Sequence, residues 1–158
     1  VRTNVLVVPS EDVEFVTALV GKAPDLLRKH KVIVFGTHAW TGMDNLSVQD
    51  LVRLNTHVPA AAYIDHSDAR TAAFIQAYRE RFKNEPGDYA LLGYDITRFY
   101  LTGLYRYGRQ LDAHFGEVDF RPLHVPLRYE RSGPENGWRN EGAVMLEYKD
   151  MTLAPALR

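Results

Sequence analysis

The chain has 158 residues, of which 46% are hydrophobic and 25% charged, and its net charge at pH 7 is −1. This length and composition suit one globular domain with its own core, and the near-neutral charge supplies no field that would attract nucleic acid. The lack of cysteine excludes disulfides, thiolate nucleophiles and cysteine-ligated zinc, and the apolar runs fall far short of the roughly 20 residues of a membrane span.

The first part of the chain alternates between strand and helix patterns. Residues 4–8 and 31–35 are apolar, β-branched runs typical of strands buried on both faces, and residues 58–64 predict a third strand. Between these runs we expect one helix with Ser10 as its N-cap and a shorter helix after Ser47. Because parallel strands need crossover connections, the alternation predicts an α/β fold with a mostly parallel sheet between helices, a three-layer α/β/α arrangement.

Two consecutive helices are predicted next. Ser67 caps a helix that runs to about Lys83, and the second helix begins at Asp88 or Tyr89 and ends at Gly108, a favourable C-cap. Their apolar faces must be buried, since exposing that much apolar surface marks an interface. We therefore expect a partner surface, a homodimer through this helical face, or further chain upstream to cover the following residues: Phe74, Tyr78, Phe82, Leu91, Ile96, Phe99, Tyr100 and Leu104.

The tail changes to a period of two from Phe120 onward. Leu123, Val125 and Leu127 alternate with less apolar positions, which predicts a half-buried strand. Residues 142–148 predict another strand, followed by a turn at Asp150. The tail is therefore expected to form an antiparallel hairpin.

Enzyme signatures are absent from the sequence. There is no nucleophile elbow, phosphate-binding loop or dinucleotide fingerprint, and no histidine has the i, i+4 partner of a helical zinc site. His66 lies beside Asp65 and Asp68, which is either a weak metal or acid–base cluster or a helix-capping loop. We expect a protein that is not an enzyme, with no catalytic residue, metal or cofactor. The rival is a small α/β hydrolase that depends on His38.

Residues 74–104 carry a resemblance to a known family. They read FIQAYRERFKNEPGDYALLGYDITRFYLTGL: an amphipathic helix, a Pro-Gly turn and a second helix opening with Gly93-Tyr94-Asp95. This order resembles the late core of the type I periplasmic solute-binding proteins, the branched-chain amino-acid receptors that serve ABC transporters as substrate-binding components. The resemblance implies a periplasmic binding protein-like I fold, and it implies that Asp95 is a polar anchor on the inner face of its helix.

The resemblance also implies how the chain is divided. Residues 1–65 correspond to the second lobe, residues 66–118 to helices of the other lobe, and residues 119–158 to the return across the hinge and a β-hairpin. The hinge is expected at Asp65, Ser67 and Phe120.

The chain is expected to be the C-terminal half of a longer receptor. It begins at Val1 in place of Met and shows no signal sequence, which favours a processed piece whose signal peptide has been removed. Residues 137–144, GWRNEGAV, are similar to the ending of relatives that carry a lysin-motif, peptidoglycan-binding segment.

The candidate ligand site lies on two loops. In open α/β sheets ligands bind beyond the carboxyl ends of the strands, where Ser10 and Glu11 follow the first strand and His38 and Trp40 follow the second. In the receptor family these loops hold the ammonium group of the ligand, although His38 stands where the receptors commonly place a carboxylate. The alternative role for Trp40 is to cover the edge of the sheet.

The resemblance implies a solute-binding domain in the periplasm or cell envelope that recognises a small polar ligand such as an amino acid, for uptake or sensing. Its partners would be that ligand and a membrane permease. The alternative is a receptor-like scaffold without a working pocket, which binds peptidoglycan or a partner protein of the envelope.

Overall fold

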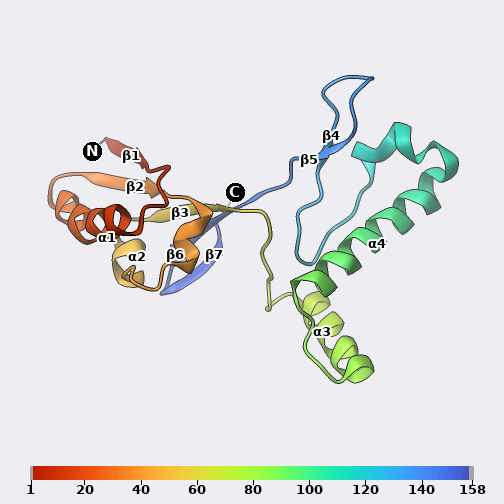
Figure 1. Cartoon of the computed structure of the whole chain (residues 1–158), viewed down its shortest axis with the longest axis horizontal. Coiled ribbons are helices and arrows are strands. Elements are labelled where there is room, and N and C mark those ends of the chain that lie inside the picture. The colour runs from red at the N-terminus through yellow and green to blue at the C-terminus, as the bar shows by residue number, and fades with distance from the viewer. Residues whose placement is uncertain (1, 157–158) are drawn as a thin grey trace. The chain divides into compact units, whose positions relative to one another are not determined.

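The computed structural model describes residues 2–156, which form two compact units (Figure 1). Unit 1 comprises the chain up to Ala60 and again from Val144, and unit 2 comprises Ala61–Ala143. Among the described residues, no helix combines the length and the apolarity that a bilayer crossing requires.

The crossings between the units differ in part from the predicted hinge. The first crossing, at residues 60–61, lies just before Asp65 and Ser67. The return lies at residues 143–144, so Phe120 belongs to unit 2, where its ring packs against the aromatic core. The resemblance to the receptors implied a return near Phe120, but residues 120–143 belong to unit 2.

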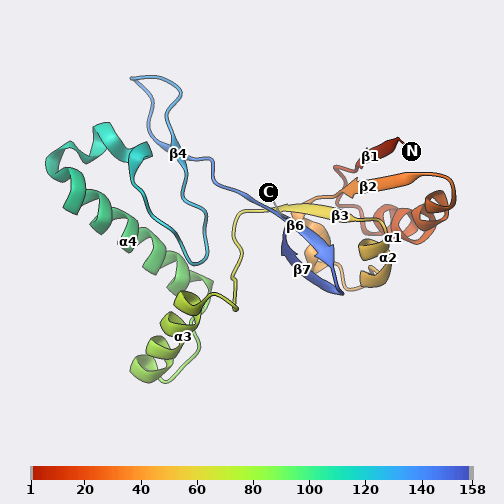
Figure 2. The ribbon, with the colours of Figure 1, turned by 180° about the vertical axis from the view of Figure 1, so that it is seen from behind.

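Unit 1 is built on a five-stranded sheet of order β1-β2-β3-β6-β7 (Figures 1 and 2). The first three strands are parallel to one another, whereas β6 pairs antiparallel with β3 and with β7. The parallel α/β core and the C-terminal hairpin are thus confirmed. The strands are β1 (Thr3–Val7), β2 (Lys31–Phe35), β3 (Thr56–Ala60), β6 (Val144–Lys149) and β7 (Thr152–Pro155).

The helices of unit 1 begin at polar caps. Asp12, not the predicted Ser10, caps α1 (Val13–Lys22), because its carboxylate accepts the N–H of Phe15 at 2.7 Å. The hydroxyl of Ser10 instead accepts the N–H of Asp12 at 3.3 Å. Ser47 caps α2 as predicted. The remaining helices of unit 1 are α2 (Val48–Arg53) and the 3-10 helices η1 (Ala23–Arg28) and η2 (His38–Gly42).

One face of the sheet is buried and the other is open at β1 and β6. Val34, Val58 and Leu146 share a face by register and are almost fully buried. On the opposite face, Val5 and Val7 are 61% and 67% exposed, so the prediction that the first strand is buried on both faces is wrong. β1 is an edge strand, and the residues described in unit 1 supply no second helical layer over this part of it.

Unit 2 contains two long helices. The N-cap of α3 is Asp68, which accepts the N–H of Arg70 at 2.9 Å, whereas the predicted cap Ser67 donates to Asp65. Gly108 is the C-cap of α4, as predicted, with a φ of 55° that favours glycine. The elements are α3 (Ala69–Phe82), α4 (Asp88–Tyr107), the 3-10 helix η3 (Gly108–Glu117), β4 (Tyr129–Glu130) and β5 (Arg139–Asn140).

Residues 123–127 do not form the predicted strand. The backbone N–H groups of Leu123, His124 and Val125 donate to the carboxylate of Asp95 at 2.8, 2.8 and 3.0 Å. A carboxylate therefore satisfies the groups that a neighbouring strand would otherwise pair. Asp95 is fully buried on α4, which confirms its prediction as an inner polar anchor.

An aromatic core cluster fills unit 2 around Phe99, Leu111 and Phe115. Phe99 is 1% exposed, so its prediction as part of an uncovered helical face is wrong, and Leu91 is buried in the same way. Other members of that face remain open, with Phe82 61% exposed and Leu104 50% exposed. The chain therefore buries only one side of α4 within unit 2.

Candidate functional site

The two predicted loops of unit 1 meet beyond the carboxyl ends of β1 and β2. The indole Nε1–H of Trp40 donates to the backbone oxygen of Ser10 at 2.9 Å, which joins the second loop to the first. Trp40 is 1% exposed, so it is packed inside the protein and offers no open face to a ligand. Of the two roles considered for Trp40, covering the sheet is the one that its burial supports.

A glycine makes room for this indole. A Cβ atom placed on Gly36 would lie 2.5 Å from the ring of Trp40, much closer than any real Cβ contact. The indole can therefore pack over the end of β2 only because the residue there has no side chain. This close approach explains why the strand ends in glycine.

The two remaining predicted residues are exposed around this junction. Glu11 has no ion-pair partner among the described residues, and the adjacent carboxylate of Asp12 is already used as a helix cap. His38 opens η2, where its carbonyl oxygen accepts the hydroxyl of Thr41 at 2.8 Å, and its imidazole is exposed. One carboxylate and one imidazole are thus open to a polar ligand on neighbouring loops.

Thr37 was not among the residues predicted from the sequence. Its hydroxyl is buried and has no hydrogen-bond partner among the described residues, and it is the one such group on the two loops. A buried hydroxyl without a partner costs about 1–3 kcal/mol, so this group is a local cost to the stability of the loop. The sequence signal was a hydroxyl residue directly after the strand-ending Gly36.

A histidine and a glutamate form a cross-strand pair in the same sheet. His57 stacks on Phe35 with ring centroids 5.1 Å apart, and its Nε2 lies 3.7 Å from a carboxylate oxygen of Glu147. Its Nδ1 lies 2.9 Å from the carbonyl oxygen of Asn55, which places the proton on that nitrogen. The Nδ1–H of His57 thus donates to Asn55, and its Nε2 forms an ion pair with Glu147 across β3 and β6 only when the imidazole is protonated.

The acidic group of unit 2 around His66 is a capping structure. Hydrogen bonds from Ser67 lower the pKa of Asp65, and hydrogen bonds from Arg70 lower the pKa of Asp68. The guanidinium of Arg70 lies 2.7 Å from Asp68. Within residues 2–156, no group of three or more histidine and acidic side chains is arranged to hold a metal ion.

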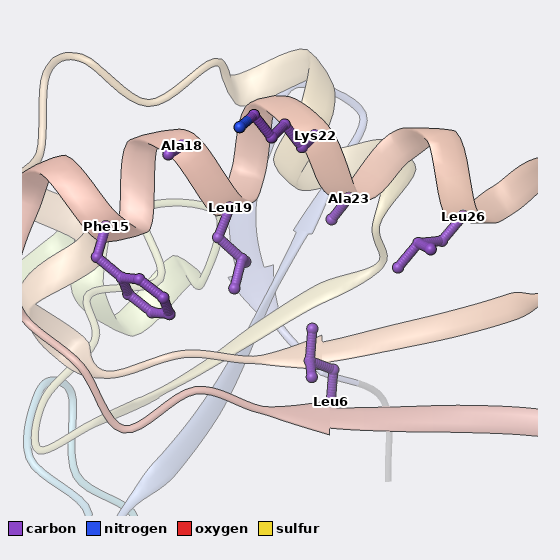
Figure 3. Close-up of a pocket in the computed structure, with 7 residues that line it drawn as sticks. All are labelled: Leu6, Phe15, Ala18, Leu19, Lys22, Ala23 and Leu26. Atoms are coloured by element: carbon purple, nitrogen blue, oxygen red, sulfur yellow. The ribbon is translucent and has the colours of Figure 1, made fainter.

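A separate cavity of about 380 Å³ lies between α1, η1 and the edge strand β1 (Figure 3). Figure 3 shows Leu6 directed from β1 toward the helix, with Phe15 and Leu19 directed back toward the strand. None of the four predicted site residues lines this cavity, and its lining residues are apolar apart from Lys22. It is therefore not the site that the two loops form.

Comparison with known proteins gave matches among solved structures. No model of a protein family matches the chain, and no curated protein matches it. An ABC transporter substrate-binding protein from Desulfitobacterium hafniense, solved in complex with Leu, is similar with a TM-score of 0.44 and 16% identity, over 89% of this chain and 39% of that chain. A second structure of a Desulfitobacterium hafniense substrate-binding protein has the same score and identity, over 89% of this chain and 40% of that chain.

A third solved protein comes from Rhodospirillum rubrum and is assigned as a branched-chain amino acid ABC transporter. Its TM-score is 0.49 at 17% identity, over 91% of this chain and 42% of that chain. The present chain thus spans 39–42% of the length of these three solved chains.

Proposed function

We propose that this chain is part of an extracytoplasmic solute-binding protein that recognises a small polar ligand such as an amino acid, for uptake or sensing. The observation that carries the proposal is the junction of the two loops through Trp40 and Ser10, at the edge of the sheet where α/β proteins bind ligands. The resemblance of residues 74–104 to the amino-acid receptors suggests the ligand class.

The side chains at this junction have complementary tasks. Glu11 supplies a negative charge for the ammonium group of the ligand, since its carboxylate is open and unpaired among the described residues. The hydroxyl of Thr37 is closed to solvent and has no partner in the protein, so it supplies a hydrogen bond only if the loops open around the ligand. His38 adds a second polar contact, while Trp40 holds the loops together as a positioning residue.

Thermal melting of the chain with a panel of amino acids tests this proposal. A ligand that binds only the folded state raises Tm, and the rise grows with ligand concentration. Glu11→Gln should weaken the binding about 10- to 150-fold, because a hydrogen bond to a charged group contributes about 1.5–3 kcal/mol. Glu14→Gln removes the same charge from the first turn of α1 and should leave the binding unchanged.

Thr37→Val is a second variant for the same experiment, and it does not change the charge of the protein. It removes the unused hydroxyl at nearly constant volume, so the Tm of the free protein should stay the same or rise, while the ligand-induced rise in Tm falls. If no amino acid raises Tm, or if Glu11→Gln and Glu14→Gln respond alike, the proposed site is wrong.

The second candidate, an envelope scaffold that binds peptidoglycan or a partner protein, is favoured by the open side of α4. Leu101 is 58% exposed, Leu104 50% and Tyr105 96%, which is a large apolar surface for a single helix. Replacing Leu101 and Leu104 with Ser should then abolish capture on peptidoglycan or dissociate a homodimer measured by light scattering. The same proposals include a location in the periplasm or envelope, a membrane permease as partner and a lysin-motif segment elsewhere in the protein.

A further inference from the structure

Unit 2 contains an aromatic pocket that the proposed function does not use. It has a volume of about 360 Å³ and is formed by α4, η3, β4 and the residues just before β5. Its lining comprises Tyr100, Leu111, Asp112, Phe115, Tyr129 and Trp138. All six residues belong to unit 2, whereas the loops of the proposed amino-acid site belong to unit 1.

The rings of this pocket are held in place by their neighbours. The indole Nε1–H of Trp138 donates to the backbone oxygen of Asp112 at 3.1 Å, so the ring is fixed beside η3. Phe115 is 8% exposed, and its ring centroid lies 4.7 Å from that of Tyr129 and 5.8 Å from that of Trp138. A Cβ on Gly116 would lie 3.3 Å from the indole, so glycine permits this close packing. The pocket is therefore built into the core of unit 2.

Several polar groups of the pocket are left for a ligand. The hydroxyls of Tyr100 and Tyr129 make no hydrogen bond to another described residue, and the side chain of Asp112 is 83% exposed. Burial, and then the nearby Tyr100, raise the pKa of Tyr129, so its hydroxyl remains a donor at neutral pH. The pocket thus combines apolar ring surface with two hydroxyls and a carboxylate.

The charge of the pocket is already balanced. The guanidinium of Arg131 lies 3.9 Å from the carboxylate of Asp112 and 5.8 Å from the centre of the Trp138 ring. The carbonyl oxygens of Gly133 and Asn136 hold this guanidinium through its Nε at 3.1 and 2.6 Å. A cationic ligand would have to compete with Arg131, and an anionic ligand would meet Asp112.

We propose that this pocket binds one pyranose ring of a neutral saccharide. A pyranose has an apolar C–H face that can pack on an aromatic ring, and hydroxyls that can pair with a carboxylate and with phenol groups. A purely apolar ligand would instead cover these polar groups without giving them partners, which is unfavourable. The volume lies within the range of small-ligand pockets.

The two tryptophans provide a direct test in the complete chain. Trp40 lies at the loop junction of unit 1 and Trp138 lies in the pocket, so a ¹⁵N–¹H spectrum has one indole signal for each site. Trp138→Phe assigns the signals. Titration with methyl β-D-glucopyranoside and N-acetylglucosamine should move the Trp138 signal saturably at millimolar concentrations and leave the Trp40 signal in place.

Variants show whether the sugar binds in this pocket or shifts the Trp138 signal without binding there. Asp112→Ala and Tyr100→Phe should each weaken the binding about 3- to 10-fold, as expected for the loss of one polar contact. Asp119→Ala, an exposed acidic residue outside the pocket, is the matched control and should bind as the parent does.

The proposal is overturned if neither sugar moves the Trp138 signal, or if the two pocket variants bind as tightly as Asp119→Ala. It is also overturned if tetramethylammonium moves that signal while the sugars do not, because the pocket would then select cations. An amino acid that moves only the Trp40 signal would support the unit 1 site, so the two proposals can fail separately.

Discussion

The carboxylate of Asp95 is predicted to be the main polar contribution to the stability of unit 2. It is fully buried and accepts the N–H groups of Leu123, His124 and Val125 at 2.8–3.0 Å. These bonds join the middle of α4 to a segment that has no strand partner there. Replacing Asp95 therefore removes the three hydrogen bonds that join the irregular segment 123–127 to α4.

The size of the effect follows from the number and exposure of these bonds. A hydrogen bond to a charged group contributes about 1.5–3 kcal/mol, and breaking a buried charged network costs about 3–5 kcal/mol. His124 and Val125 are half-buried, so their N–H groups can partly regain water, whereas Leu123 is 7% exposed and cannot. We therefore expect Asp95→Ala to destabilise unit 2 by about 3–4 kcal/mol, which for a unit of this size corresponds to a fall in its Tm of roughly 12–32 °C.

Asp95→Asn is the more informative variant because it keeps the shape of the side chain. Its oxygen can still accept, but its NH₂ group would face N–H donors, so we expect about 2–3 kcal/mol of destabilisation. Hydrogen exchange of the amides of residues 123–125 should accelerate in both variants. Asp88→Asn, an exposed acidic residue in the first turn of the same helix, is the control.

Asp95 does not hold this segment if the stability of Asp95→Asn lies within about 0.5 kcal/mol of the parent, the usual range for a surface substitution. Unchanged protection of the three amides would lead to the same conclusion. Denaturant unfolding followed by near-UV circular dichroism gives the stability, and two transitions are to be fitted separately because the chain has two units.

Two further predictions concern Gly36 and Asp68. Gly36→Ala should displace the ring of Trp40, shift its fluorescence to longer wavelength and cost about 1–3 kcal/mol, whereas Gly21→Ala, with open space at its Cβ, should do neither. Hydrogen bonds from Arg70 lower the pKa of Asp68, so its stabilising effect is present above about pH 4 and is lost as the pH falls through the lowered folded-state pKa. The Tm of Asp68→Asn should therefore fall less steeply than that of the parent between neutral and acidic pH. Identical pH profiles of Tm would contradict this assignment.

Much of the fold could be predicted from local patterns. The β-branched run Lys31–Phe35 became β2, and the glycine after Tyr107 became the C-cap of α4, because such signals act over a few residues. The parallel sheet followed from the same short-range alternation of strands and helices. The position of Asp95 on the inner face of its helix was predicted from the resemblance.

The remaining differences come from long-range contacts that no local pattern reveals. Leu123, Val125 and Leu127 have the period of a strand, but the backbone N–H groups of Leu123 and Val125 donate to the carboxylate of Asp95, which lies 28 and 30 residues earlier in the sequence. Val5 and Val7 are as β-branched as residues of a buried strand, yet they lie at the edge of the sheet. The period of a strand indicates how its side chains alternate and not what covers them.

The candidate site, like the fold, could be predicted only in part. The sequence indicated which loops follow the strands, and the structure joins them through Trp40 and the carbonyl of Ser10. The sequence did not indicate that Trp40 is buried, because a tryptophan in a loop can contact either a ligand or the rest of the protein. Thr37 was missed because a hydroxyl without a partner is visible only when its surroundings are known.

The division of unit 1 into two stretches of chain has a consequence for the order of folding. Unit 2 is continuous, so all of its contacts can form as soon as residue 143 has left the ribosome. In unit 1, β3 pairs with β6, and residue His57 meets Glu147 only after the whole of unit 2 has been synthesised. Closing so long a loop is slow and exposes β3 in the meantime. Unit 2 is therefore expected to fold first, and the sheet of unit 1 is completed last, when the C-terminal hairpin adds to β3.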